Sequence, residues 1–146
     1  MLADEEHAFL QRIAVAVSAC VGAVMTHFPS GLRVDASGPG GFDMSVMIED
    51  GKYILYFGNW TEDFLSEDAA RRTFEAALSG DARLRAETLA GRQWRWTLER
   101  RDEDGQWIAE STVAHVIWRF WGRRETIYLR NTFPRRLPLT RASVAR

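Results

Sequence analysis

Apolar residues at the start of the chain recur at the spacing of a helix. They follow an acidic beginning, in which Asp4 is a suitable N-cap and Glu5 and Glu6 lie at the positive end of the helix dipole. Pro29 and Gly31, residue types that commonly follow helix ends, come directly after the last apolar position. The pattern therefore predicts one long N-terminal helix, with an apolar stripe made of Phe9, Ile13, Val17, Val21, Val24, Met25 and Phe28.

Alternating apolar and polar residues then predict three short strands, at residues 32–37, 42–49 and 52–58. The pair Asp50-Gly51 indicates a type I′ hairpin turn, because both central residues of that turn need positive φ. The glycine loop 38–41 leads into a strand, whereas a phosphate-binding loop leads into a helix, so we interpret it as a connector. We also expect residues 59–63 to be a polar connector that carries one large aromatic residue.

A second helix is expected between Ser66, which suits the N-cap position, and Gly80, which suits the position after the helix. Its narrow apolar stripe predicts that it lies across one face of a sheet. That stripe consists of Ala70, Phe74, Ala77 and Leu78. Residues 82–89 resume the alternation of a strand, and Ala90-Gly91 is expected to turn the chain.

The tryptophan-rich stretch from residue 92 to residue 133 is expected to form three or four antiparallel strands. A four-residue loop at 102–105 would place Thr97 opposite Glu110, and it would avoid a like-charge pair between Glu99 and Glu110. A second hairpin that turns at residues 122–123 would place Trp118 opposite Ile127 and Val116 opposite Leu129.

The apolar face of this stretch changes parity between Ser111 and His115, which predicts a β-bulge or a sharp bend there. The order of elements, α-β-β-β-α-β followed by further strands, predicts an α+β fold. We expect a single domain over residues 1–133, built on a curved, mainly antiparallel sheet with both helices packed on it. The end, residues 134–146, contains Arg135, Arg136, Arg141 and Arg146 without an acid, and we expect an extended basic tail.

The amino-acid composition indicates the cellular compartment and the type of genome. The single cysteine, Cys20, excludes an intrachain disulfide and lies within an apolar run, so we expect a buried thiol and a reducing compartment. The acidic start differs from a secretory signal, and the apolar run 13–25 is too short to span a bilayer. We therefore expect a cytoplasmic protein without membrane contact, and the use of arginine over lysine indicates a bacterial genome rich in GC.

Charge is divided along the chain. Residues 1–70 hold 3 basic and 11 acidic side chains, a balance of −8, whereas residues 71–146 hold 16 basic and 9 acidic ones, a balance of +7. Such a division is compatible with complementary packing of the two halves, with head-to-tail association, and with an anionic partner for the basic half. It leaves these three interpretations open.

One group of side chains is a candidate binding site. The second predicted hairpin and the strand before it gather arginine, histidine and aromatic residues, which together can hold an anionic or planar small molecule. A plain sheet face, on which arginine stems cover aromatic rings, would show the same pattern, and so would a protein interface. The candidate residues are His115, Arg119, Trp121, Tyr128, Arg130 and Arg95.

Motifs for catalysis are missing from the sequence: the three histidines are far apart, and neither HExxH nor GxSxG occurs. We expect no cofactor or metal. Our leading hypothesis is a non-enzymatic module that binds a partner protein or forms a homodimer. The alternative is a small-molecule pocket in the curved sheet, with or without catalysis. The net charge of −1 and the single lysine argue against nucleic-acid binding.

Overall fold

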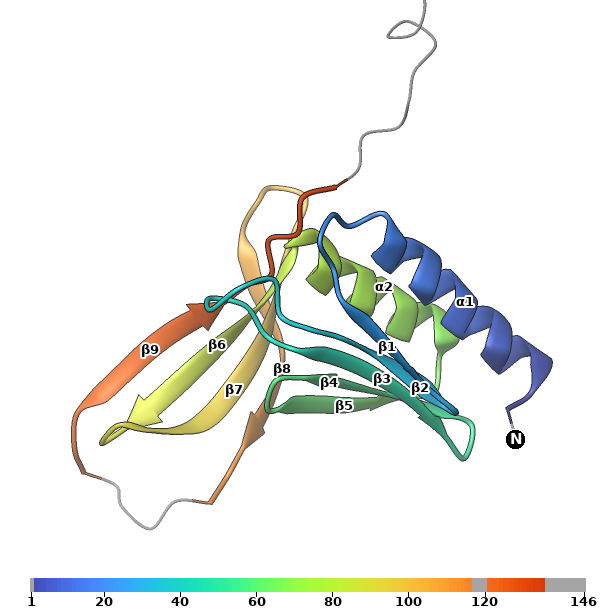
Figure 1. Ribbon diagram of the computed structural model, residues 1–146. Helices are drawn as coiled ribbons and strands as arrows, with labels where there is room; N and C mark the ends of the chain where they lie inside the picture. Colours follow the sequence, from blue (N-terminus) through green and yellow to red (C-terminus); the bar gives the residue numbers. More distant parts are fainter. Residues whose placement is uncertain (1, 117–120, 136–146) are drawn as a thin grey trace, which may run out of the picture.

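The computed structural model describes residues 2–116 and 121–135. Within these residues the chain forms two helices and nine strands, and the predicted α+β class with antiparallel pairing is confirmed. The strands belong to two sheets (Figure 1). The bounds are α1 Asp4–Ser18, β1 Met25–Phe28, β2 Gly31–Val34, β3 Met44–Glu49, β4 Lys52–Phe57, β5 Trp60–Phe64, α2 Glu67–Ser79, β6 Ala82–Leu89, β7 Arg92–Arg101, β8 Trp107–Ala114 and β9 Arg124–Leu129.

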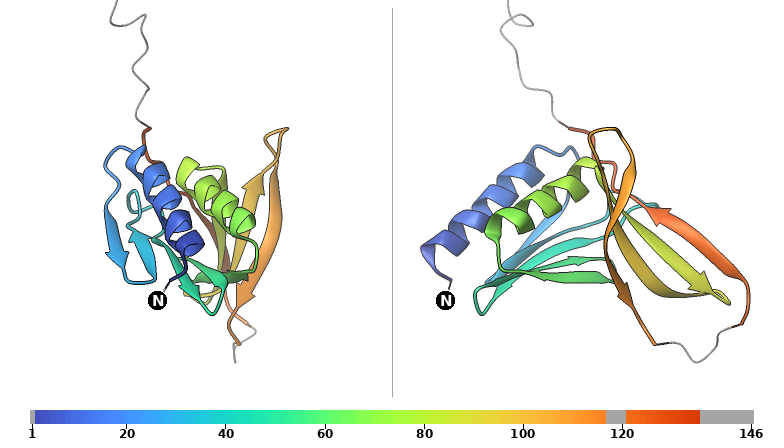
Figure 2. Two further views of the ribbon diagram at one scale, coloured as in Figure 1. Left: turned by 90° about the vertical axis from the view of Figure 1, so that its right-hand side faces the viewer. Right: turned by 180° about the vertical axis from the view of Figure 1, so that it is seen from behind.

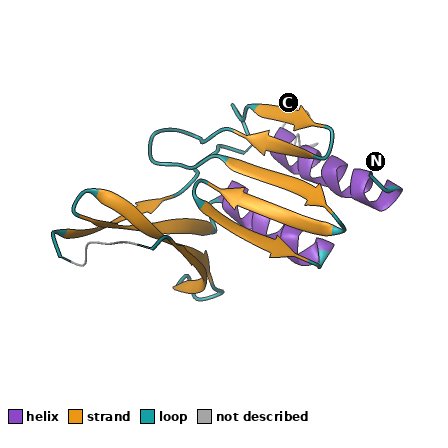
Figure 3. Cartoon of the chain, turned by 90° about the horizontal axis from the view of Figure 1, so that it is seen from below, coloured by secondary structure: helices purple, strands orange, loops and turns teal. Residues whose placement is uncertain are grey.

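The first sheet has the order β1-β2-β3-β4-β5, and every neighbouring pair is antiparallel. Both helices cover one face of it, and Figure 3 shows the opposite face in front of them without a covering element. The alternation of β3 and β4 explains this arrangement, because Val46 and Leu55 are fully buried while Ser45 and Ile54 are only partly covered. Phe9 of α1 and Phe74 of α2 complete the core on the covered side.

The second sheet has the order β8-β7-β6-β9 and extends beyond the helices (Figures 1 and 2). One of its faces contributes Leu84, Trp96 and Leu98 to the same hydrophobic core as the first sheet. The indole of the fully buried Trp60 donates a hydrogen bond of 3.0 Å to Ser111 Oγ, which links β5 to β8. The core therefore fixes the second sheet against the first.

The N-terminal helix is shorter than predicted, because α1 ends at Ser18. Gly22 has a φ of +78°, and Met25–Phe28 pairs with β2 as strand β1 instead of forming the last helical turns. Val21 and Val24 continued the apolar period, but β-branched residues beside a glycine are poor helix formers. His27, which falls within the span of the predicted helix, lies opposite Leu32 in a hairpin.

Residues 59–63 were predicted to be a connector, and this is wrong, because Trp60–Phe64 forms strand β5. The chain reverses at Gly58, whose φ is +57°, and Trp60 then stacks on Phe57 with ring centroids 5.0 Å apart. The polar residues Thr61 and Asp63 are the exposed positions of a period-two pattern. These residues are therefore polar because they face solvent on an edge strand, and not because they form a connector.

Pairing in the tryptophan-rich stretch also differs from the prediction. Thr97 lies opposite Thr112, and the register shifts between Leu98 and Glu99, so that Glu110 is the extra residue of a β-bulge. The predicted irregularity is thus present, one residue before the predicted range. At this bulge Ala109 lies opposite Glu99, so the like-charge pair between Glu99 and Glu110 is avoided, although the register differs from the predicted one.

The last strand does not return to β8, as the second hairpin required. Instead β9 pairs with β6, with Ile127 opposite Ala86 and Leu129 opposite Leu84. Val116 therefore does not face Leu129, and Trp118 lies outside the described residues. An edge strand on the far side of the sheet cannot be told from a hairpin partner by its apolar pattern alone.

Several local predictions are confirmed. Asp50 and Gly51 have φ values of 50° and 74°, as a type I′ turn requires. Ser66 Oγ accepts a hydrogen bond of 3.2 Å from the Ala69 amide, and Gly80 ends α2 in the left-handed conformation. Cys20 is 4 % exposed, and burial raises the pKa of its thiol. Of the predicted tail, Pro134 and Arg135 lie beside residues 20–21, and residues 136–146 are outside the described part.

Neither described helix is both long and apolar enough to cross a membrane.

Candidate functional site

The second sheet turns a polar face away from the core. On β6, Leu84 and Ala86 are fully buried in the core, so Arg83 and Arg85 point to the opposite side. The register of the neighbouring strands places polar side chains of β7 and Tyr128 of β9 on that side too. We call this surface the arginine–aromatic face, and it comprises Arg83, Arg85, Glu87, Arg95, Thr97, Glu99, Arg101, Trp107, Tyr128 and Arg130.

Two aromatic rings organise the arginines of this face. The guanidinium carbon of Arg83 lies 4.2 Å from the ring centroid of Trp107 and 4.1 Å from that of Tyr128. Arg101 and Arg130 approach the Trp107 ring to 4.8 and 5.5 Å. All these distances fall within the range of cation–π attraction. One indole ring therefore gathers three guanidinium groups.

Two carboxylates partly balance these charges. Glu99 is 5 % exposed and accepts hydrogen bonds from Arg83 Nε at 2.7 Å and from Arg85 at 2.9 Å. Glu87 accepts two hydrogen bonds from Arg95, at 2.5 and 2.6 Å. These hydrogen bonds lower the pKa of Glu87 and raise the pKa of Arg95, because each group stabilises the charged form of the other.

Positive charge remains in excess. The face carries five arginines, Arg83, Arg85, Arg95, Arg101 and Arg130, against the two glutamates. In the described part of the chain neither Arg101 nor Arg130 forms an ion pair, although Arg130 Nε donates a hydrogen bond of 2.7 Å to the Gly80 carbonyl. The face can therefore offer guanidinium donors to carboxylate or phosphate oxygens from outside the chain.

The structure brings together three of the predicted site residues, namely Arg95, Tyr128 and Arg130. His115 is separate from them, because its ring makes an edge-to-face contact of 5.1 Å with Trp96 on the core side of the sheet. Trp121 is 67 % exposed and lies between the strands β8 and β9, on neither of them. Arg119 lies outside the described residues.

Sequence reasoning missed the centre of the face, which consists of Arg83, Trp107 and the buried Glu99. The alternation of Arg83 and Arg85 with Leu84 and Ala86 was a usable signal, because it puts both arginines on one side of a strand. Their meeting with Trp107 and Tyr128 depends on strand order. That order was predicted incorrectly, so the cluster could not be found.

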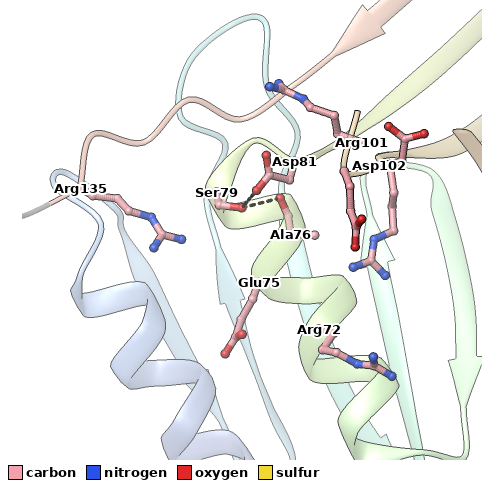
Figure 4. A pocket seen from close by; sticks show the side chains of 10 residues that line it. Arg72, Glu75, Ala76, Ser79, Asp81, Arg101, Asp102 and Arg135 are labelled. Carbon is pink, nitrogen blue, oxygen red and sulfur yellow. Dashed lines mark hydrogen bonds between the residues drawn. The ribbon is translucent and has the colours of Figure 1, made fainter. Parts of the chain in front are cut away.

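A hollow of about 680 Å³ lies between α2, the turn from β7 to β8, and Arg135 (Figure 4). In its lining, the Ser79 hydroxyl lies within hydrogen-bond distance of two acceptors, the Ala76 carbonyl at 3.1 Å and Asp81 Oδ2 at 3.0 Å. Its charged lining is evenly divided between four bases and four acids. These residues are Arg72, Arg100, Arg101, Arg135, Glu75, Asp81, Asp102 and Glu103.

Among the described residues, no group of three or more histidine, cysteine, aspartate and glutamate side chains is arranged to hold a metal ion. Comparison of the chain with models of protein families, with curated proteins and with solved structures found no match. The assignment of a function therefore depends on the geometry of the site alone.

Proposed function

We propose that the chain is a non-enzymatic protein-binding module, and that its arginine–aromatic face docks an acidic segment of a partner protein. The observation that carries this proposal is the gathering of three guanidiniums around Trp107. Of these three, Arg83 is paired with a carboxylate, whereas Arg101 and Arg130 form no ion pair with any described residue.

Ordered arginines favour such binding for two reasons. A guanidinium binds a carboxylate through two parallel hydrogen bonds, so both the charge and the geometry of an acidic side chain are recognised. Contacts with Trp107 and Tyr128 hold the arginines in place before a partner arrives, which reduces the conformational entropy lost on binding. Tryptophan, tyrosine and arginine are also the residue types enriched at the energetic centres of protein interfaces.

The shape of the face supports a protein partner over a small molecule. Its residues come from all four strands of the second sheet and form an extended surface. The hollow beside α2 has a volume typical of ligand sites, but its lining is charged where such sites are mostly apolar. The small-molecule hypothesis consequently has weaker support. We also propose that the protein is bacterial and cytosolic, and this part of the proposal is based on the amino-acid composition of the chain.

The test is a titration with a poly-glutamate peptide, monitored by calorimetry and by the tryptophan fluorescence of the chain, with poly-glutamine of the same length as the control peptide. We expect saturable binding of poly-glutamate that weakens as salt is added, because exposed charge pairs are screened. Arg101→Gln combined with Arg130→Gln should weaken binding roughly tenfold, since each exposed pair contributes about 0.5–1 kcal/mol.

Arg100→Gln is the matched control. Arg100 and Arg101 both line the hollow, but only Arg101 also contacts Trp107 on the arginine–aromatic face, whereas Arg100 lies on the other side of β7 beside Glu110. If the peptide binds the face, Arg100→Gln should therefore bind it as the wild type does. Equal loss in the control and in the double variant would assign the peptide to the hollow. Absence of saturable binding in the wild type would refute the proposed function.

A further inference from the structure

The chain carries an acidic surface as well as a basic one. The first turns of α1 and α2 and the turn between β3 and β4 all lie at the end of the molecule away from the second sheet (Figure 1). We call this surface the acidic end. Its carboxylates are Asp4, Glu5, Glu6, Glu49, Asp50, Glu67 and Asp68.

Carboxylates from both helices of the acidic end lie near Tyr53. Tyr53 lies near the turn between β3 and β4, and burial, followed by the negative charges of Glu67, Glu6 and Glu5, raises the pKa of its hydroxyl. These charges come from two helices that are far apart in sequence. Four basic side chains lie among the seven carboxylates, since Arg12 pairs with Glu67 at 2.5 Å, Arg71 and Arg72 pair with Asp68 at 2.6 and 3.1 Å, and Lys52 lies opposite Glu49. Negative charge remains in excess.

The division of charge along the sequence therefore corresponds to a division in space. All seven carboxylates of the acidic end lie within residues 1–70, whereas the arginine–aromatic face is built by residues beyond 82. Figures 1 and 2 show the N-termini of the helices at one end of the molecule and the second sheet at the other. One copy cannot bring its own two surfaces together, but two copies can.

We infer that the acidic partner of the arginine–aromatic face is the acidic end of a second copy of this chain. The inference rests on the proposed function and names its partner. Because the two surfaces are different and lie at opposite ends, the contact is head-to-tail, and each added copy leaves one surface of each kind available. The expected assemblies are short chains or a closed ring that exceed a dimer.

Sedimentation velocity on the wild type, over a range of concentrations and salt, is the first measurement. We expect the mean mass to rise past that of a dimer as concentration increases at low salt, and to return to that of a monomer at high salt. A wild type that stays monomeric, or that stops at a dimer, would overturn the inference.

Two variants then test which surfaces meet. The face variant combines Arg101→Gln with Arg130→Gln, and the end variant combines Asp4→Asn, Glu5→Gln and Asp50→Asn. The substitutions in the end variant are at exposed positions, and asparagine at position 50 suits a type I′ turn. Each variant retains one intact surface, so each alone should associate at least tenfold more weakly than the wild type.

An equimolar mixture of the two variants should restore a one-to-one dimer and stop there, because the remaining two surfaces are both neutralised. A mixture that stays monomeric, or an end variant that assembles like the wild type, would contradict the head-to-tail contact. A monomeric wild type that still binds poly-glutamate would overturn this inference and leave the proposed function standing. A wild type that neither self-associates nor binds poly-glutamate would refute both this inference and the proposed function.

Discussion

Glu99 is the one charged side chain that is buried in the described part of the chain. It lies beneath the side chains of Arg83 and Arg85, which are 22 % and 33 % exposed, and it accepts a hydrogen bond from each. A buried carboxylate is tolerated only when its charge is paired. Glu99 therefore holds two of the five arginines of the face in place.

Replacing Glu99 by glutamine should lower the free energy of unfolding by about 2–3 kcal/mol, because two partly covered guanidiniums would lose their counter-charge. Unfolding in urea measures this change. Glu110→Gln is the control, since Glu110 is 42 % exposed and lies 3.7 Å from Arg100, and it should cost less than about 1 kcal/mol. Equal costs for the two substitutions would show that Glu99 has no special role.

The pair formed by Glu87 and Arg95 predicts a dependence on pH. Arg95 lowers the pKa of Glu87 in the folded protein below its ordinary value of 4.5, so folding favours the ionised carboxylate. The resulting stability is present above the ordinary pKa and is lost as the pH falls through the lowered one. Arg95→Gln should therefore lower the melting temperature at pH 7, and this deficit should shrink steadily below pH 4.5. A deficit that is the same at both ends of the range would contradict this account.

Single residues of the site were predictable where the pattern of one strand decides which face of the sheet they occupy. Arg95, Tyr128 and Arg130 were identified because alternation along a strand assigns each side chain to a face. The same alternation along β7 puts Glu99 on the side that carries Arg95. Its burial was not predictable, because Arg83 and Arg85 reach it from a neighbouring strand, and alternation along one strand does not report pairing between strands.

The two helices differ at their first residues. Ser66 caps α2 with its side chain, whereas Ala3 occupies the corresponding position of α1 without a side-chain hydrogen bond. The backbone of Ala3 is already extended, as an N-cap requires, and its amide donates to Glu6 Oε1 at 2.8 Å. A capping residue at position 3 would therefore fit without rearrangement.

Ser66→Ala should destabilise the protein by about 1 kcal/mol, and Ala3→Ser should stabilise it by about 0.5–1 kcal/mol, because a cap hydrogen bond is removed in one case and added in the other. Thermal melting of the two variants beside the wild type measures both effects. Shifts in the same direction would contradict the assignment of these two caps.

Elements with strong local signals were predictable, and elements defined by their partners were not. The turn at Asp50-Gly51, the ends of α2 and strand β6 follow from turn and cap chemistry within a few residues. Strand β1 continues the apolar period of α1, so only its pairing with β2 reveals it. Strand β9 carries a normal strand pattern, but its place beside β6 depends on the whole sheet.

Over the whole molecule, one core joins two sheets that present very different surfaces. The first turns of both helices and the turn between β3 and β4 form the acidic end, and the second sheet forms the arginine–aromatic face. The hydrogen bond from the indole of Trp60 to Ser111 is one of the contacts that connect the two sheets. Because the core fixes the two sheets to one another, the separation of charge is a permanent property of the fold, which favours association between copies over closure of one copy on itself.

We propose that the arginine–aromatic face binds acidic protein segments. The most direct measurement is a heteronuclear NMR titration with poly-glutamate, which follows the side-chain Nε–Hε signals of the arginines and the indole signal of Trp107. We predict saturable shifts in the signals of Arg101, Arg130 and Trp107 that disappear when salt is added. Unchanged signals on this face, or shifts confined to Arg72 and Arg100 in the hollow, would contradict the claim.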